Sequence, residues 1–390
     1  MMRIMLARFK NVLGAMRMTK QEVLTAAVLL FLLYASSVMM FIGMNFWLWS
    51  FKKGLKRSYT SIFIPSVGWS FLFCASSAAI RIINWKIGRS ENVFFWWNRR
   101  GVFFLALIGL FDSLTGLCCM YAAVHVPVIL QSALISTGPI WTYLFAFIFY
   151  PESQSSFSPI LLLVVACTAG GVALAMIPQT QSHRKNEYFS PPWIAIFLLG
   201  VILYPLYNVL QGRFLNEFRG SCSPFTTKIV MLTCETTVQL VFTLMYFPLD
   251  AAPFFGKCAS LQESWDMLIA SIKCVAECPN NAVYMSVYIL GFWIRHTVFA
   301  YMNEYSPVVV AVASQLTQPL NTFILLIIPS WNVFGANALW YYTLGCFLLL
   351  LASTVIFVWW HLLNRPVYQE VRAVVFGVPE NEDTNENENK

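Results

Sequence analysis

Charged residues are scarce in this sequence. Asp, Glu, Lys and Arg make up 11% of its 390 residues, hydrophobic residues make up 58%, and the mean hydropathy is +0.64. Soluble domains carry about 25% charged residues. Because a soluble fold cannot hide so much apolar surface, the composition excludes an ordinary soluble domain and indicates lipid as the solvent.

The short motifs of soluble enzymes are also missing. The sequence has no phosphate-binding Gly loop ending in Lys-Ser or Lys-Thr, no HExxH and no GxSxG. Its four histidines are scattered along the chain. We therefore predict no enzyme, no cofactor and no metal site. The net charge of +7 lies mostly in loops beside apolar runs, which favours membrane lipids over nucleic acid as partners.

Long apolar runs are the dominant feature that is present. A hydrocarbon core of about 30 Å needs roughly 20 helical residues per crossing. Strand alternation is absent, and backbone groups in lipid must be paired internally, so the runs are predicted helices. The sequence thus predicts an all-α integral membrane protein with ten transmembrane helices, at about 22–50, 60–85, 101–124, 126–150, 157–178, 190–211, 225–248, 282–303, 306–329 and 337–363.

Lys and Arg in the loops predict the orientation. Placing the amino-terminal stretch in the cytosol puts more of them inside than outside, so both termini are expected to be cytosolic. Residues 1–21 mix basic and apolar residues at roughly helical spacing, which predicts an amphipathic helix on the membrane surface; a targeting peptide is the alternative. Residues 364–390 end in an acidic stretch that predicts a disordered cytosolic tail.

An internal repeat links the two halves of the chain. Residues 121–148 align without gaps to 301–328, and both prolines of each segment fall in register. Each segment is the fourth run of a five-run half. Because five is odd, the halves must have opposite orientations, which is the architecture of inverted-repeat transporters. The predicted parts are a first repeat over 22–178, a connecting loop over 179–189 and a second repeat over 190–363.

Polar residues inside the runs mark a candidate substrate site. Asp112, Glu235 and Arg295 are ionisable within apolar runs, where each is costly unless solvated or paired. Neutral polar residues gather near prolines, where a kink frees backbone carbonyls. The predicted substrate-binding residues are Asp112, Glu235, Gln131, Ser136, Thr137, Tyr204, Tyr207, Asn208, Arg295, Gln315, Gln318 and Asn321, and the predicted gating or kink residues are Pro139, Pro205 and Pro319. The alternative is that these side chains join helices.

The loop at 249–281 is the one long connection between the runs. A capping-box spacing from Ser260 to Glu263 predicts a short amphipathic helix that ends near Pro279. The loop also carries Cys258, Cys274 and Cys278. The last two are one helical turn apart, so either is expected to pair with Cys258 rather than with the other.

Several of these segments resemble a known family. The pattern Tyr121-Ala-Ala-Val-His-Val-Pro127 with Ser136-Thr-Gly-Pro139, its counterpart from Tyr301 to Pro319, and Leu110-Phe-Asp112-Ser113 are similar to the drug/metabolite transporter superfamily. The cysteine-bearing loop, basic start and acidic tail resemble its chloroquine-resistance transporter family. That family's loop commonly carries four cysteines for two disulfides, whereas this loop carries three.

The resemblance implies ten helices, cytosolic termini and a central cavity built from helices 1–4 and 6–9. It also implies a vacuolar or lysosome-like membrane across which amino acids, small peptides or cationic drugs move by alternating access, with protons as possible coupling ions. We expect a monomer, because no dimerisation motif stands out. The alternatives are a nucleotide-sugar exchanger of the secretory pathway, for which Lys228 and Arg295 would bind phosphate, and a non-transporting membrane enzyme or receptor.

Overall fold

The structure is a computed structural model that describes residues 20–52, 55, 59–89, 91–149, 159–181, 191–256, 258–303, 313–314, 317–334 and 340–364. The predicted surface helix over 1–21, apart from its last two residues, lies outside this part of the chain. So do the tail after Asn364 and most of the 179–189 loop. Within the described residues every regular element is a helix and none is a strand.

The helices follow the predicted apolar runs closely. They are α2 (Lys20–Ser50), α3 (Thr60–Lys86), α4 (Arg99–Ala123), α5 (Val128–Ile135), α6 (Gly138–Phe149), α7 (Pro159–Gln181), α8 (Pro191–Glu217), α9 (Pro224–Met245), η2 (Phe247–Ala251), α10 (Leu261–Glu277), α11 (Asn281–Asn303), α13 (Thr317–Ile327), η3 (Pro329–Trp331) and α14 (Trp340–Asn364).

Eight apolar segments of the described residues are long enough to cross a membrane: Ala27–Ser50, Thr60–Lys86, Arg99–Ala123, Val128–Phe149, Pro191–Glu217, Pro224–Ala251, Asn281–Met302 and Trp340–Phe357. Two more apolar helices, Leu162–Pro178 and Thr317–Ile327, are shorter. The chain is therefore an all-α, multi-pass membrane protein, as predicted. The full count of ten crossings stays a prediction.

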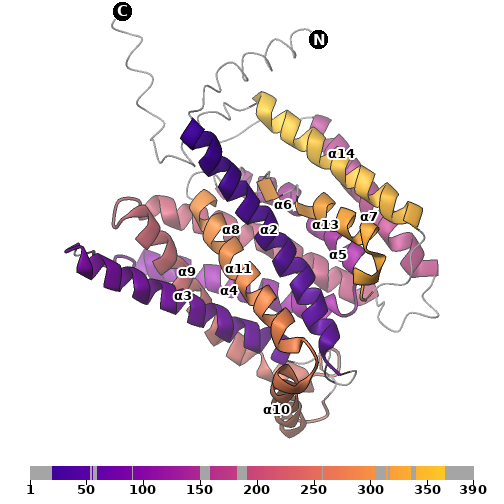
Figure 1. Ribbon diagram of the computed structural model, residues 1–390, viewed down its shortest axis with the longest axis horizontal. Helices are drawn as coiled ribbons and strands as arrows, with labels where there is room; N and C mark the ends of the chain where they lie inside the picture. Colours follow the sequence, from indigo (N-terminus) through magenta and orange to yellow (C-terminus); the bar gives the residue numbers. More distant parts are fainter. Residues whose placement is uncertain are drawn as a thin grey trace, which may run out of the picture.

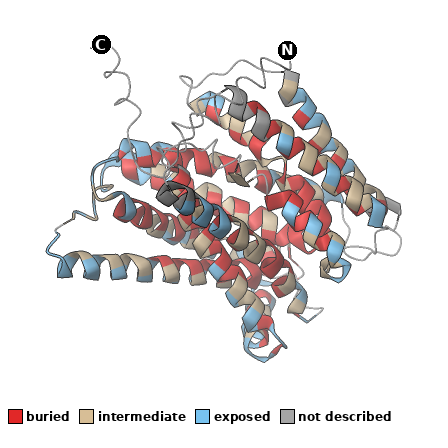
Figure 2. Ribbon diagram, turned by 45° about the horizontal axis from the view of Figure 1, so that its top comes forward, coloured by how far each residue is buried: buried red, intermediate tan, exposed pale blue. Residues whose placement is uncertain are grey.

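The helices form one bundle in which α10 lies at one end (Figure 1). We call this the α10 end, and we call the opposite end, where α2 begins at Lys20, the Lys20 end. The last turns of α3 project sideways from the bundle at the Lys20 end (Figure 1). Buried residues concentrate where the helices face one another, and exposed residues lie on the outer faces (Figure 2). Many of these exposed residues are large and apolar, as expected of a lipid-facing surface.

The fourth predicted run is broken into two helices. α5 ends at Ile135 and α6 begins at Gly138, with Ser136 and Thr137 between them. The Ser136 hydroxyl donates to the carbonyl of Ala133 and the Thr137 hydroxyl to that of Leu134, while Thr137 Oγ1 also accepts from Trp141 Nε1 at 3.1 Å. Pro139 then stands in the first turn of α6, where its missing N–H costs nothing. The kink predicted at this proline therefore takes the form of a two-residue interruption.

Helices from opposite halves of the sequence pack closely. α2 lies against α11, α4 against α8, α3 against α9 and α7 against α14. In the α2–α11 pair, a Cβ added at Gly291 would lie 2.6 Å from the backbone N of Met40. In the α4–α8 pair, a Cβ added at Gly200 would lie 2.6 Å from Cys119 Sγ. The absence of side chains at these glycines lets the paired backbones approach.

The connection that contains α10 confirms the predicted short helix, but its disulfide differs from the predicted one. Ser260 Oγ accepts a hydrogen bond from Glu263 N at 3.2 Å, so Ser260 caps the helix, and Glu263 Oε2 accepts from the backbone N of Ala259 at 2.6 Å. The helix ends at Glu277, and Cys278 has extended backbone angles. Because Cys278 is no longer helical, it folds back to within 4.8 Å (Cα to Cα) of Cys274, and these two cysteines form the disulfide. Cys258, expected to take one of them, is a buried free thiol.

Candidate functional site

A cavity of ≈ 160 Å³ lies in the middle of the bundle. This volume is far above the roughly 10–15 Å³ that one water molecule needs. Helices from both halves of the sequence line it. The lining residues are Met40, Phe41, Met44, Trp69, Asp112, Thr115, Gly116, Cys119, Met120, Ile135, Gly138, Pro139, Thr142, Phe197, Val201, Tyr204, Pro205, Tyr207, Asn208, Gln239, Tyr288, Phe292, Arg295, His296, Phe299, Ser314 and Gln318.

Many of the residues predicted from sequence meet at this cavity. Asp112 comes from α4, Arg295 from α11 and Gln318 from α13, which are far apart in the chain. The other predicted residues that line the cavity are Tyr204, Tyr207, Asn208, Pro139 and Pro205. Pro205 lies inside α8, which continues through it.

Asp112 is the acidic residue of the cavity wall. Its side chain is 4% exposed, and Oδ2 has no hydrogen-bond partner among the described residues. A buried carboxylate oxygen without a donor is costly. It is stabilised either by a donor that the described residues do not supply, such as a water or a bound solute, or by protonation of the carboxylate itself.

Glu235 lies behind the wall rather than on it. It is fully buried on α9, and its Oε2 accepts a hydrogen bond from Gln211 Nε2 at 2.6 Å. Its second oxygen, Oε1, has no partner among the described residues. Asp112 and Glu235 interact electrostatically, so the centre of the bundle holds two neighbouring acids.

Arg295 is the cation of the cavity wall. It is 5% exposed, and Nε donates to Ser37 Oγ at 3.1 Å. Its guanidinium carbon lies 4.3 Å from the ring centroid of Phe299 and 5.1 Å from that of Tyr204, so cation–π contacts help to hold it. No carboxylate oxygen of the described residues lies within 4.0 Å of it. Glu235 is therefore not the ion-pair partner of Arg295, and within the described part of the chain the charge of Arg295 has no carboxylate partner.

His296 is held in one tautomer. Its Nδ1 lies 3.1 Å from the carbonyl of Phe292, which can only accept, so a neutral ring carries its proton on Nδ1. Nε2 is then an acceptor, and Tyr207 Oη donates to it at 2.9 Å. The two bonds satisfy both ring nitrogens inside the bundle.

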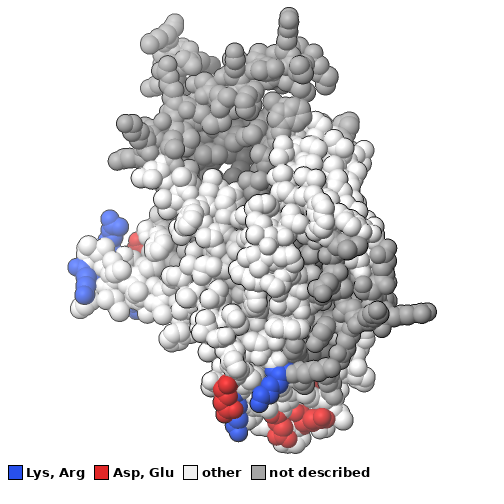
Figure 3. Space-filling model, turned by 45° about the vertical axis from the view of Figure 1, so that its right-hand side comes forward, with Lys and Arg blue, Asp and Glu red and all other residues white. Residues whose placement is uncertain are grey.

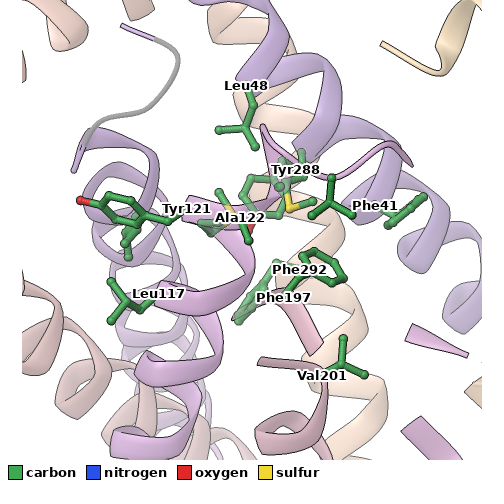
Figure 4. Packing of buried hydrophobic residues seen from close by; sticks show 14 of the residues in the cluster. Phe41, Leu48, Leu117, Tyr121, Ala122, Phe197, Val201, Tyr288 and Phe292 are labelled. Atoms are coloured by element: carbon green, nitrogen blue, oxygen red, sulfur yellow. The ribbon is translucent and has the colours of Figure 1, made fainter. Parts of the chain in front are cut away.

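Aromatic rings form much of the remaining wall. Trp69 and Phe292 stack with centroids 3.7 Å apart, and Phe292 stacks on His296 at 3.5 Å. Phe197 lies beside Phe292 in the close view of the core (Figure 4). This wall favours a solute with an apolar part.

Two further lining residues were missed by the sequence reasoning. Thr115 and Gln239 each have a buried side-chain oxygen without a partner among the described residues. Thr115 lies one helical turn after Asp112 on α4, which places both on one face. That spacing was the signal in the sequence that could have identified Thr115.

Other predicted residues are not among those that line the cavity. Gln131 forms two hydrogen bonds with the Asn45 side chain and two with the carbonyls of Ala123 and Val126, so it joins α2 to the turn before α5. Ser136, Thr137, Asn321 and Pro319 are not among the lining residues, and Gln315 lies outside the described residues. Lys228 donates to the Pro224 carbonyl at 3.2 Å and also does not line the cavity.

The comparisons with known proteins give no family. No protein-family model matches the chain, and no curated protein matches it. A solved structure titled "Crystal structure of protein" is similar over 82% of this chain and 97% of its own, with 15% sequence identity and a TM-score of 0.42.

Proposed function

We propose that the protein is a secondary transporter that moves small organic solutes by alternating access through the central cavity. The observation that carries this proposal is a cavity enclosed by helices of both halves, with the unpartnered Oδ2 of Asp112 in its wall. Concave, mostly apolar sites with a few convergent polar groups are the usual form of small-molecule sites.

The packing of the helices supports a 5+5 inverted repeat of ten crossings. If α2, α3, α4, α5–α6 and α7 correspond in order to α8, α9, α11, α13 and α14, exchanging the halves converts the α2–α11 pair into the α8–α4 pair. The α3–α9 and α7–α14 pairs are converted into themselves. The main contacts are thus those expected of a pseudo-two-fold arrangement, in which substrates bind between the repeats.

The wall chemistry supports amino acids, small peptides or cationic drugs as substrates. Asp112 offers an acceptor to an ammonium group, Arg295 offers a cation to a carboxylate, and the aromatic wall accepts an apolar part. The two acids Asp112 and Glu235 provide protonation sites for coupling to a proton gradient. Together with the family resemblance, this favours a vacuolar or lysosome-like membrane with both termini in the cytosol.

Uptake into proteoliposomes with an imposed pH gradient tests the proposal. Amino acids, short peptides, cationic drugs and nucleotide sugars form the solute panel. Gradient-driven uptake of a solute of the first three classes, lost in Asp112→Asn and in Glu235→Gln, is the expected result. The matched control is Asp266→Asn, the same change at an exposed position on α10, which should transport normally. No uptake of any solute by monodisperse wild-type protein would reject the transporter, whereas binding or modification of a lipid would favour the enzyme or receptor.

The rival nucleotide-sugar exchanger has a separate signature. It needs cations for the diphosphate, and of the two cations considered from sequence only Arg295 lines the cavity. Exchange that is indifferent to the pH gradient and lost in Arg295→Gln would replace the proposal with this rival.

A further inference from the structure

A second cavity lies on the side of the bundle, at the Lys20 end of α3 and α9. It has a volume of ≈ 810 Å³ and shares no lining residue with the central cavity. Its walls are the last turns of α3, the first turns of α9 and the connection from α3 to α4. Both helices are long enough to cross the membrane, and α3 ends where α9 begins. The cavity between these helix ends therefore faces the bilayer interface.

The lining of this cavity changes from apolar to cationic along the helix axis. On α3, Cys74 and Ala78 lie deeper toward the bilayer centre than Arg81, and Arg89 lies beyond the end of the helix. At 1.5 Å per residue, about 10 Å separate Cys74 from Arg81 along the axis. The antiparallel α9 follows the same order, with Cys234 deep and Thr226 at the interface. The hydroxyls of Ser77 and Thr233 also lie in the deep part, but they form a hydrogen bond with each other at 2.6 Å. They therefore do not need water as a partner there.

The cationic part has spare positive charge. Arg81 is exposed, and no carboxylate oxygen of the described residues lies within 4.0 Å of it. Glu91, the acid of the lining, accepts hydrogen bonds from Asn84 Nδ2 at 3.0 Å and from Ser223 N and Oγ at 3.3 Å. The hydrogen bond from Thr226 is the largest cause that lowers the pKa of Glu91, so it stays ionised and offsets one arginine. The two arginines of the lining, Arg81 and Arg89, therefore keep one net positive charge between them for an outside anion.

Aromatic side chains surround the cationic part. Trp85 is 78% exposed on α3, and Phe94 and Trp97 are 60% and 73% exposed in the following connection. Exposed Trp and Phe beside Arg are typical of the headgroup level of a membrane. Charged side chains also gather on the projection at the left of Figure 3, while the described part of the middle of that face carries none.

We propose that this cavity binds a phospholipid with an anionic headgroup. The phosphate lies against Arg81 and Arg89, and an acyl chain lies along Ala78, Val230 and Cys234. The order of these groups matches the order of a lipid molecule at the depth where α3 and α9 meet the interface. A free phosphate would use the arginines but leave the apolar part of the cavity uncovered.

Native mass spectrometry of the detergent-purified chain tests the site. The probes are phosphatidylserine, phosphatidylinositol 4-phosphate and zwitterionic phosphatidylcholine, with inorganic phosphate as the soluble competitor. The expected result is one preferentially bound anionic lipid per chain. Arg81→Gln and Arg89→Gln should each weaken its binding about fivefold, and the double variant about 25-fold.

Two further variants distinguish lipid binding in the cavity from a general attraction of anionic lipids to positive charge. Arg99→Gln removes the same charge at the same end of the bundle, outside the cavity, and should leave binding unchanged. Ala78→Trp fills the acyl part while keeping both arginines, so it should abolish binding of the lipid. It also keeps the test decisive if the double variant fails to fold.

Three outcomes would overturn the proposal. They are equal binding of the anionic and zwitterionic lipids, equal losses in Arg81→Gln and Arg99→Gln, and full displacement by inorganic phosphate with Ala78→Trp unaffected. The last would identify a phosphate site rather than a lipid site. None of these outcomes depends on transport, so the lipid site and the proposed function can fail separately.

Discussion

Asp250 joins three segments at the α10 end of the bundle. It is 1% exposed, and its Oδ2 accepts a hydrogen bond from the backbone N of Tyr59 at 2.7 Å. Its Oδ1 accepts from Tyr121 Oη, also at 2.7 Å. Tyr59 precedes α3 and Tyr121 is in the last turn of α4, so one carboxylate links both helices to η2. We predict that the bond from Tyr121 to Asp250 is among the stronger single contacts in the protein.

The magnitude follows from the charge and burial of the acceptor. A hydrogen bond to a charged group contributes about 1.5–3 kcal/mol, roughly twice a neutral one. Tyr121→Phe should therefore lower the free energy of unfolding by about 1.5–3 kcal/mol. Asp250→Asn should cost a similar amount, because an amide presents one acceptor where two donors converge. In the double variant the shared bond is lost once, so the two losses should not add.

A double-mutant cycle measures this coupling. Unfolding in mixed micelles with increasing dodecyl sulfate, followed by Trp fluorescence, gives the four free energies. The expected coupling between Tyr121 and Asp250 is about 1.5–3 kcal/mol. The control is Tyr246→Phe, whose hydroxyl lies 2.9 Å from Ser113 Oγ instead, and it should add to Asp250→Asn within about 0.5 kcal/mol. A Tyr121–Asp250 coupling as small as that of the control would refute the reasoning.

Three other predictions concern stability. Gly291→Ala should destabilise the protein by about 1–3 kcal/mol in the same unfolding assay, because the new Cβ meets the backbone of α2; Gly138→Ala, with nothing within 4 Å, should not. Breaking the Cys274–Cys278 disulfide with two serines should cost only about 2 kcal/mol, because the bridge closes a loop of separation 4. Since the folded-state pKa of Glu91 lies below its ordinary 4.5, its stabilisation is present above pH 4.5 and is lost as the pH falls through the lowered pKa, so Glu91→Gln should flatten the thermal-stability profile on the acid side of pH 4.5.

The helix positions were predictable because they depend on local properties of the sequence. The apolar run at 60–85 became Thr60–Lys86, and the run at 282–303 became Asn281–Asn303. Chain length in lipid and the need to pair every backbone group fix such segments without reference to their neighbours. The Ser260 cap of α10 was predictable for the same reason, because its partner Glu263 is within one turn.

The roles of individual polar residues depend on distant partners and were harder to predict. Gln131 had the sequence features of a substrate ligand, but its amide pairs with Asn45 on another helix. Periodicity cannot reveal such a partner. The predicted pairing of Cys278 was wrong for a different reason. The exact end of a helix is poorly defined by sequence, and Cys278 lies one residue beyond the end of α10, which is enough to change the cysteine with which it pairs.

The glycine contacts bear on how the chain is made. α2 leaves the ribosome long before α11, yet α11 is the helix that fills the space beside Gly43 and that packs against α2 at Gly291. Until then the close-packing face of α2 can meet only lipid or another protein. The amino-terminal half therefore cannot mature as a domain while the rest is being translated. Its quality control during biogenesis depends on the arrival of α11, and a truncation before that helix would leave a membrane-inserted chain that cannot complete its fold.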